Sequence, residues 1–201
     1  MIQQLAVKTA EKMSKYGVIE EKSSRIYAYG LELLFSSLAG VVVLIFISAV
    51  QGNPHLWIPY LAGFVPLRLS GGGYHAKTHF RCIFTFSLLY LLVLIIGQIF
   101  PIPAALWPVF CLINLAVIFL FSPVEASNKP LKVSQNTANR RISLFLGVIN
   151  LFGCIASLFL QSVHSQWANM YFSGSSTASL SMLLAVINSN EKRRRFHEKV
   201  G

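Results

Sequence analysis

Aspartate is absent from this 201-residue chain, and charged residues of every kind are scarce. They make up 12% of the sequence, against about 25% in typical soluble domains, whereas hydrophobic residues make up 54%. This shortage excludes an ordinary soluble globular domain. It also excludes a nucleic-acid-binding protein, although the formal net charge is +10. The 17 lysines and arginines are clustered rather than spread, and their placement has another explanation.

Long apolar runs occupy most of the chain. A transmembrane helix needs roughly 20 mostly apolar residues, and five runs meet this requirement. A sixth run, 55–69, is shorter and holds Pro59 and Pro66, so that it is either a kinked crossing or a re-entrant segment. If it crosses, the chain is an all-α integral membrane protein with six transmembrane helices, over residues 31–50, 55–69, 83–100, 102–121, 142–160 and 167–188.

The positions of the cations favour a full crossing by residues 55–69. Six crossings with a cytoplasmic N-terminus place all 17 lysines and arginines on the inner side. The opposite turns, near 51–54, 97–103 and 161–166, contain no charged residue. A re-entrant segment would move three cations to the outer side and spoil this separation. Because cytoplasmic loops are rich in Lys and Arg, we expect six spans with both termini in the cytoplasm.

The two ends of the chain are basic. Residues 1–29 place apolar side chains near one helical face and lysines elsewhere, which predicts an amphipathic helix at the membrane interface on anionic lipid. They lack the apolar core and the cleavage site of a signal peptide. Residues 189–201 are interpreted as a basic cytoplasmic tail. Since internal repeats and low-complexity segments are also lacking, we expect a single membrane domain over residues 1–201.

Small side chains recur at helical spacing in the last expected span. Ser173, Thr177 and Ser181 are four residues apart, as are Gly174 and Ala178. Small residues at this spacing let helices approach closely, so the pattern predicts a packing face. The same face permits a homodimer.

The segment from Arg68 to Cys82 concentrates the reactive side chains. Its sequence is RLSGGGYHAKTHFRC, with a cysteine, two histidines and several cations. A thiol beside imidazole groups and fixed cations acts as a nucleophile. The other cysteines, Cys111 and Cys154, fall mid-span among Phe, Leu and Ile, and are expected to be inert buried side chains. Cys82 is therefore the candidate nucleophile, the alternative being a thiol that merely starts a helix.

Two histidines compete as the base for Cys82. On one straight helix, His75 would share a face with Cys82 but lie about 10 Å away along the axis, whereas proton transfer needs about 3 Å. His79, three residues before Cys82, would be closer. However, Gly71, Gly72 and Gly73 permit backbone conformations that other residues resist, so a loop could fold His75 back over the thiol. Both histidines stay candidates on spacing alone.

Two short segments carry a resemblance to a known protein family. Ser70-Gly71-Gly72-Gly73-Tyr74-His75-Ala76-Lys77 is followed by Cys82 and then by an apolar span. Ser122-Pro123-Val124-Glu125 is followed by Asn128-Lys129-Pro130-Leu131. Together these segments resemble the accessory gene regulator protein B family. Its members are bacterial integral-membrane cysteine endopeptidases that process a quorum-sensing propeptide, and the chain is similar to them in size, multiple spans and basic inner loops.

The resemblance implies roles for the reactive residues. It makes Cys82 the nucleophile of a thiol protease and His75 its general base, with no cofactor and no metal, and leaves His79 as a competing or assisting base. The implied partner is a small AgrD-like propeptide. Its C-terminal part is cleaved through an acyl-thioester, and the remainder closes into a thiolactone or lactone. The implied location is a bacterial cell membrane, with the active site at the cytoplasmic face and a homodimer as the family's reported assembly.

Several cations are candidate substrate-binding residues. Arg68 and Lys77 lie within the reactive segment and could hold the thiolate or a substrate carboxylate. A basic inner loop could bind an acidic peptide tail, and its cations are Lys129, Lys132, Arg140 and Arg141. All of these cations also fit ordinary positive-inside anchoring. No third catalytic residue stands out, and Glu125 and Ser87 are weak candidates for orienting the imidazole.

Two other functional classes fit parts of the sequence. His75, His79 and Cys82 follow a spacing that could present three zinc ligands along one helical face, although Lys77 and Arg81 alongside disfavour a cation. A peptide transporter or channel without enzymatic activity is the second class. Its crossings should carry buried charges or paired broken helices. Apart from Glu32 and the prolines, the expected spans do not.

Overall fold

The computed structural model describes residues 2–73, 78–100, 102–124, 133–159 and 166–200. Within these residues the chain is helical and contains no β-strand, apart from a one-residue bridge between Gly72 and Val124. The all-α prediction is therefore confirmed for the described part of the chain. The elements are α1 (Ile2–Lys15), η1 (Glu21–Ser23), α2 (Ser24–Val50), α3 (Trp57–Gly71), α4 (His79–Ile99), η2 (Ala104–Leu106), α5 (Trp107–Phe121), α6 (Val133–Phe159) and α7 (Gln166–Val200).

Four of the described helices, α2, α4, α6 and α7, are long and apolar enough to cross a membrane. α3 and α5 have 15 residues each and are therefore about 22 Å long. The hydrocarbon core of a bilayer is about 30 Å thick. Length and composition thus support four crossings, and the predicted count of six is not confirmed for α3 and α5.

Proline explains why α5 begins later than the apolar run suggested. The run begins at residue 102, but α5 begins at Trp107. Between them lies the 3₁₀ turn η2, in which the Leu106 N–H donates to the Pro103 carbonyl at 2.9 Å. Pro108 then occupies the first turn of α5, where its missing N–H costs nothing. Conversely, α2 and α6 begin before their apolar runs, because polar residues continue the helix.

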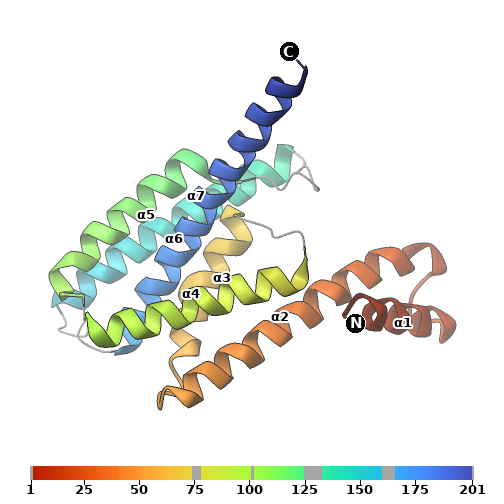
Figure 1. The fold of residues 1–201 in the computed structure, drawn as a ribbon, viewed down its shortest axis with the longest axis horizontal. Coiled ribbons are helices and arrows are strands. Elements are labelled where there is room, and N and C mark those ends of the chain that lie inside the picture. Colours follow the sequence, from red (N-terminus) through yellow and green to blue (C-terminus); the bar gives the residue numbers. More distant parts are fainter. Residues whose placement is uncertain (1, 74–77, 101, 125–132, 160–165, 201) are drawn as a thin grey trace.

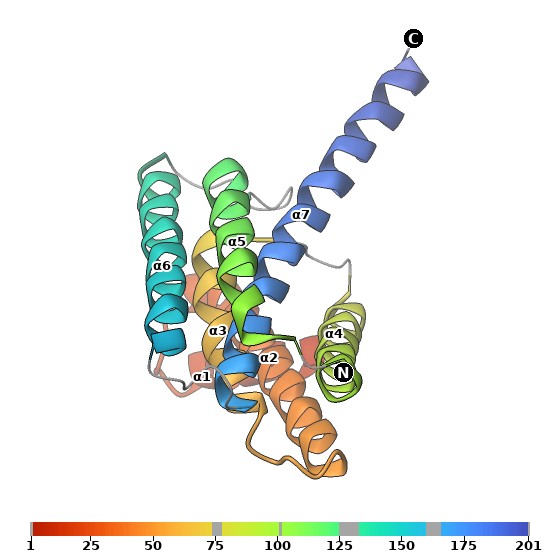
Figure 2. The ribbon, with the colours of Figure 1, turned by 90° about the vertical axis from the view of Figure 1, so that its left-hand side faces the viewer.

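The helices pack in two connected groups (Figures 1 and 2). In the first group, α3 lies against α7 and α6, and α5 lies against α6 and α7. In the second, α4 lies beside α2, and α1 folds back along the start of α2. The α1–α2 hairpin projects from the rest of the molecule in Figure 1, and the end of α7 extends beyond the other helices in both views.

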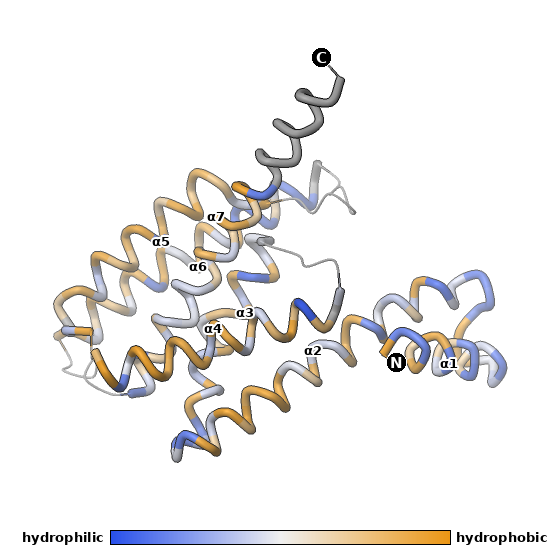
Figure 3. Tube along the Cα trace, viewed as in Figure 1, coloured by the Kyte–Doolittle hydropathy of each residue, from blue (hydrophilic) through white to orange (hydrophobic). Residues whose placement is uncertain are grey.

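The outer surface is apolar on most helices. Phe46 on α2, Leu120 on α5 and Phe152 on α6 are each about two-thirds exposed. Figure 3 shows long hydrophobic stretches on α2, α4 and α5, and more hydrophilic residues on α1 and at the start of α2. Soluble monomers rarely expose contiguous apolar patches of this extent. The solvent of these helices is therefore lipid, and the chain is a membrane protein.

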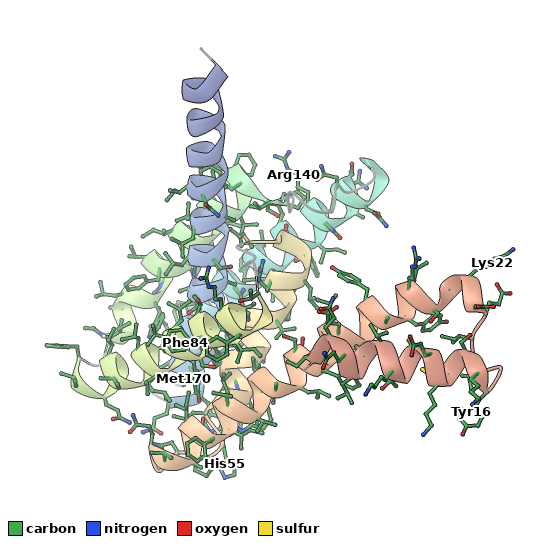
Figure 4. The ribbon with its side chains drawn as sticks, turned by 45° about the vertical axis from the view of Figure 1, so that its right-hand side comes forward. Tyr16, Lys22, His55, Phe84, Arg140 and Met170 are labelled. Carbon is green, nitrogen blue, oxygen red and sulfur yellow. The ribbon has the colours of Figure 1, made fainter. Side chains whose placement is uncertain are left out.

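The predicted N-terminal amphipathic helix is present as α1. Its residues Ala6 and Ala10 are fully buried, and α1 packs along α2. Its lysines, Lys8, Lys12 and Lys15, are exposed. Tyr16 and Lys22 mark the far end of the hairpin in Figure 4. The helix is therefore confirmed, while its place at a membrane interface stays a prediction.

α3 and α7 cross in close contact through two glycines. A Cβ added at Gly63 would lie 2.1 Å from the Tyr171 carbonyl oxygen, and one added at Gly174 would lie 2.2 Å from the Tyr60 carbonyl oxygen. Ala178 is fully buried on the same helix. The predicted packing face of the last span is thus confirmed, and it packs against α3 of the same chain.

We predict that Gly63→Ala and Gly174→Ala destabilise the protein. Each added methyl group would meet backbone at about 2 Å, so the helices must separate, at a cost of about 1–3 kcal/mol. Thermal unfolding in detergent should show a lower midpoint for both variants. Gly153→Ala on α6 is the control, because nothing lies within 4 Å of its added Cβ. Equal midpoints for all three variants would contradict the close crossing.

Candidate active site

The three consecutive glycines end α3 and turn the chain. α3 ends at Gly71, and the next two residues have positive φ values, 74° at Gly72 and 138° at Gly73. Only glycine adopts these conformations without strain. α4 then begins at His79. Residues 68–82 are therefore not one straight helix, as the glycine argument anticipated. His75 lies outside the described residues, so its predicted approach to Cys82 is not tested.

A segment from the end of α5 docks on this glycine turn. The Val124 N–H donates to the Gly71 carbonyl at 2.9 Å, and Gly72 pairs with Val124 in a parallel bridge. The same segment is also held by α6, because the Ser122 Oγ lies 2.5 Å from the Oγ of Ser143. The two segments that carried the family resemblance, some 50 residues apart in sequence, thus meet through their backbones.

Gly72 leaves no room for a side chain at this docking point. An added Cβ would lie 2.2 Å from the Val124 carbonyl oxygen. We predict that Gly72→Ala loosens the docked segment, so that the Val124 amide exchanges hydrogen at least about tenfold faster, equivalent to about 1.4 kcal/mol of opening free energy. Gly52→Ala is the matched control, because Gly52 has a φ of 75° but nothing within 4 Å of an added Cβ. Unchanged exchange at Val124 in Gly72→Ala would refute the docking.

Arg68 lies beneath the glycine turn. A Cβ added at Gly73 would lie 2.5 Å from Arg68 Nη1 and 2.6 Å from the Oγ of Ser181 on α7. The half-buried guanidinium also interacts electrostatically with Cys82. The structure therefore places Arg68 within electrostatic range of Cys82. Sequence reasoning missed Ser181 as a neighbour of this site, because its four-residue spacing was interpreted only as helix packing.

Cys82 lies in the first turn of α4. Its N–H donates to the Thr78 carbonyl at 3.1 Å, and the Thr78 hydroxyl caps the helix by accepting from the Arg81 N–H at 3.3 Å. The thiol is free and exposed. The N-terminus of a helix carries partial positive charge, and the Arg68 guanidinium interacts electrostatically with this thiol. The thiol thus has the access and the surroundings that a nucleophile needs.

His79 begins α4, three residues before Cys82 on an unbroken helix. This is the backbone placement expected if His79, rather than His75, is the base for Cys82. The described coordinates do not include its side chain, so the choice between His79 and His75 stays open. Ser87, a weak candidate for orienting the imidazole, is buried further along α4.

The remaining cations of the predicted site are only partly described. Arg140 and Arg141 are exposed near the start of α6, where Figure 4 labels Arg140. They lie one turn before Ser143, which contacts the docked segment through Ser122. They therefore lie at the same end of the bundle as the glycine turn. The other predicted cations, Lys77, Lys129 and Lys132, fall outside the described residues, as does Glu125.

No group of three His, Cys or Glu side chains that could hold a metal ion occurs among the residues whose placement is described. The zinc alternative depends on His75 and on the side chain of His79, which lie outside that set. It is therefore not tested.

The family of the chain follows from comparison with known proteins. The family model described as Accessory gene regulator B matches residues 6–188, which include every helix named above in whole or in part. An AgrB-like protein of Clostridium beijerinckii is 25% identical over 142 residues, which is 69% of this chain and 67% of that protein. No solved structure matches the chain significantly. This membrane protein therefore belongs to the accessory gene regulator B family and has a role in the quorum-sensing system of that name.

Proposed function

We propose that this protein is a membrane cysteine endopeptidase that cleaves a small quorum-sensing propeptide and supports its cyclisation. The observation that carries this proposal is the exposed thiol of Cys82 at a helix N-terminus, in electrostatic contact with Arg68 beneath the glycine turn. A free cysteine in such surroundings suits nucleophilic catalysis. Membership of the accessory gene regulator B family supports a peptide-processing role.

The proposed first half-reaction forms an acyl-enzyme. His75 takes the proton from the Cys82 thiol, and the thiolate attacks a backbone carbonyl of the propeptide. The carbon–nitrogen bond breaks, and the C-terminal part leaves as an amine that takes the proton back from the imidazole. The N-terminal part remains as a thioester on Cys82. Arg68 stabilises the thiolate or holds a substrate carboxylate, with Lys77 as a second cation.

The proposed second half-reaction closes the ring. A cysteine thiol or serine hydroxyl within the propeptide attacks the thioester and releases Cys82, giving a thiolactone or lactone. Exchange between thioesters is nearly thermoneutral, so the free energy of the peptide bond is not lost before ring closure. Water must be excluded from the acyl-enzyme for this step to compete with hydrolysis. In this proposal the glycine turn and the Ser122–Val124 segment docked on it shield one side of the acyl-enzyme from water.

The basic inner loop is proposed to bind an acidic C-terminal tail of the propeptide. Arg140 and Arg141 are exposed at the end of the bundle that holds the glycine turn. Lys129 and Lys132 precede them in the sequence, in the connection between α5 and α6. In this proposal the four cations hold the departing segment by charge. They also fit the inner face of a membrane protein.

The proposed topology is six crossings with both termini in the cytoplasm. The difference in charge between the two ends of the bundle supports this topology. Arg140 and His55 lie at opposite ends of the bundle in Figure 4. The connections at the His55 end lack Lys, Arg, Asp and Glu. In this topology α3 and α5 cross as short helices within the bundle, and α1 lies on the inner membrane surface. The site then faces the reducing cytoplasm, which keeps the Cys82 thiol free.

Trapping the thioester tests the proposed chemistry. The substrate is the propeptide encoded by a small reading frame beside this gene, expected to have a basic amphipathic N-terminus, a central Cys or Ser and an acidic tail. Membranes mixed with propeptide labelled in its N-terminal part and quenched in acid should yield a labelled protein band that neutral hydroxylamine removes. Cys82→Ala should give no such band. Cleavage without any hydroxylamine-sensitive adduct, or an adduct that survives in Cys82→Ala, would overturn the proposal.

A further inference from the structure

Two cysteines outside the candidate active site lie against each other. Cys111 on α5 is 2% exposed and Cys154 on α6 is fully buried, and both belong to one cluster with Trp107 and Phe172. The two side chains therefore lie in the same buried contact between α5 and α6, close enough for their thiols to interact. These cysteines are more than 40 residues apart in the sequence, and the apolar residues around each of them give no reason to pair them.

The packing of α5 on α6 explains why the two thiols face each other. A Cβ added at Gly147 would lie 2.9 Å from Leu115 Cδ1, 3.1 Å from Ile118 Cδ1 and 4.0 Å from Leu115 Cα, so the helices approach closely at this point. The helices run in opposite directions. Seven residues back from Ile118 is Cys111, and seven residues on from Gly147 is Cys154. Seven residues are two helical turns, about 10 Å, so both cysteines keep the same facing side. Disulfides require such closely held backbones.

The pair lies at the end of the bundle remote from Cys82. Cys111 is one turn from the start of α5 at Trp107, and Cys154 is within two turns of the end of α6 at Phe159. In the topology proposed above, this end faces the outside, where disulfides persist, whereas Cys82 faces the reducing cytoplasm. The assignment of the pair to the outer side rests on the proposed topology. The packing of Cys111 against Cys154 is independent of it.

We propose that Cys111 and Cys154 are a reversible oxidation site that forms an interhelical disulfide. Each thiol loses its hydrogen and a sulfur–sulfur bond forms. The two electrons and two protons pass to a lipid-soluble two-electron oxidant such as a quinone, which becomes the quinol. A thiol reductant reverses the step. The bond links α5 to α6 covalently at one end, while Ser122 and Ser143 join the same two helices near the glycine turn.

Counting free thiols tests the proposal. The full-length protein in detergent is treated with copper–phenanthroline in air, denatured and labelled with a polyethylene glycol maleimide. The untreated protein should carry three labels, since the chain has three cysteines. The oxidised protein should lose two labels, remain a monomer and regain both after dithiothreitol. Mass spectrometry of the oxidised wild type should identify the peptide that links Cys111 to Cys154, so this arm needs no variant.

Matched variants assign the lost labels. After oxidation, Cys82→Ser should carry no label, whereas Cys111→Ser and Cys154→Ser should each keep both remaining labels. Three labels on the oxidised wild type, or a linked peptide that contains Cys82, would overturn the proposal. None of these measurements uses the propeptide, so their failure is distinct from failure of the proposed peptidase function.

Discussion

Cys82→Ala is expected to abolish cleavage of the propeptide, lowering the rate by about 10³-fold or more. Alanine removes the sulfur that the proposed acyl-enzyme requires, and no other described side chain near the glycine turn is a thiol. The measurement is release of the C-terminal fragment from purified protein in lipid vesicles. The effect should fall on kcat rather than on propeptide binding, because the basic inner loop is unchanged.

Two further cysteine variants serve as controls for this result. Cys111→Ala and Cys154→Ala make the same cysteine-to-alanine change on α5 and α6, remote from the glycine turn. Cleavage in both should stay within a few fold of the wild type once matched for amount of folded protein. If Cys82→Ala cleaves at the rate of these controls, the thiol is not the nucleophile and a different reaction class is required.

His75→Ala is expected to lower kcat by about 10²–10⁴-fold, the usual contribution of a general base. The physical reason is the break between the helices. Because α3 ends at Gly71 and α4 begins at His79, the separation of about 10 Å that one straight helix would impose between residue 75 and Cys82 does not apply. His79→Ala, one helical turn before Cys82, is the matched comparison and should change kcat by only a few fold.

The pH dependence separates the roles of the two histidines. A general base accepts a proton only in its neutral form, so cleavage by the wild type should rise with pH as the imidazole loses its proton. Loss of this limb in His75→Ala but not in His79→Ala would support the proposed assignment. The opposite pattern would make His79 the base and contradict the role given to His75.

Apolar periodicity and length predicted most helices of this fold. The expected spans coincide with α2 to α7 because continuous apolar runs leave few alternatives in lipid. Boundaries were less accurate at Trp107, where a 3₁₀ turn after Pro103 delays α5, and at Ser24, where α2 begins before its apolar run. The shortness of α3 was visible in the run over 55–69, whereas that of α5 was not, because it results from the turn that delays the start of the helix.

Contacts between distant segments could not be predicted from the sequence. The triple glycine indicated a turn near Cys82, and the turn is present. Nothing in the spacing indicated that Val124 would pair with Gly71 and Gly72, because that contact is made by backbone groups. The place of Arg68 beside Cys82 was a hypothesis drawn from their proximity in sequence. Its position under Gly73 and next to Ser181 depends on the crossing of α3 with α7.

The backbone pairing at the glycine turn has a consequence for sequence variation. Val124 contributes backbone groups, and its side chain packs against the buried cluster of Leu67, Ile118 and Met182. Other apolar residues at position 124 therefore preserve the joint, whereas proline does not because it lacks the N–H. Gly72 contributes the absence of a side chain and has no substitute. A saturation library of the two positions should therefore be asymmetric, with apolar residues tolerated at 124 and near-complete intolerance at 72, although the two residues form a single contact.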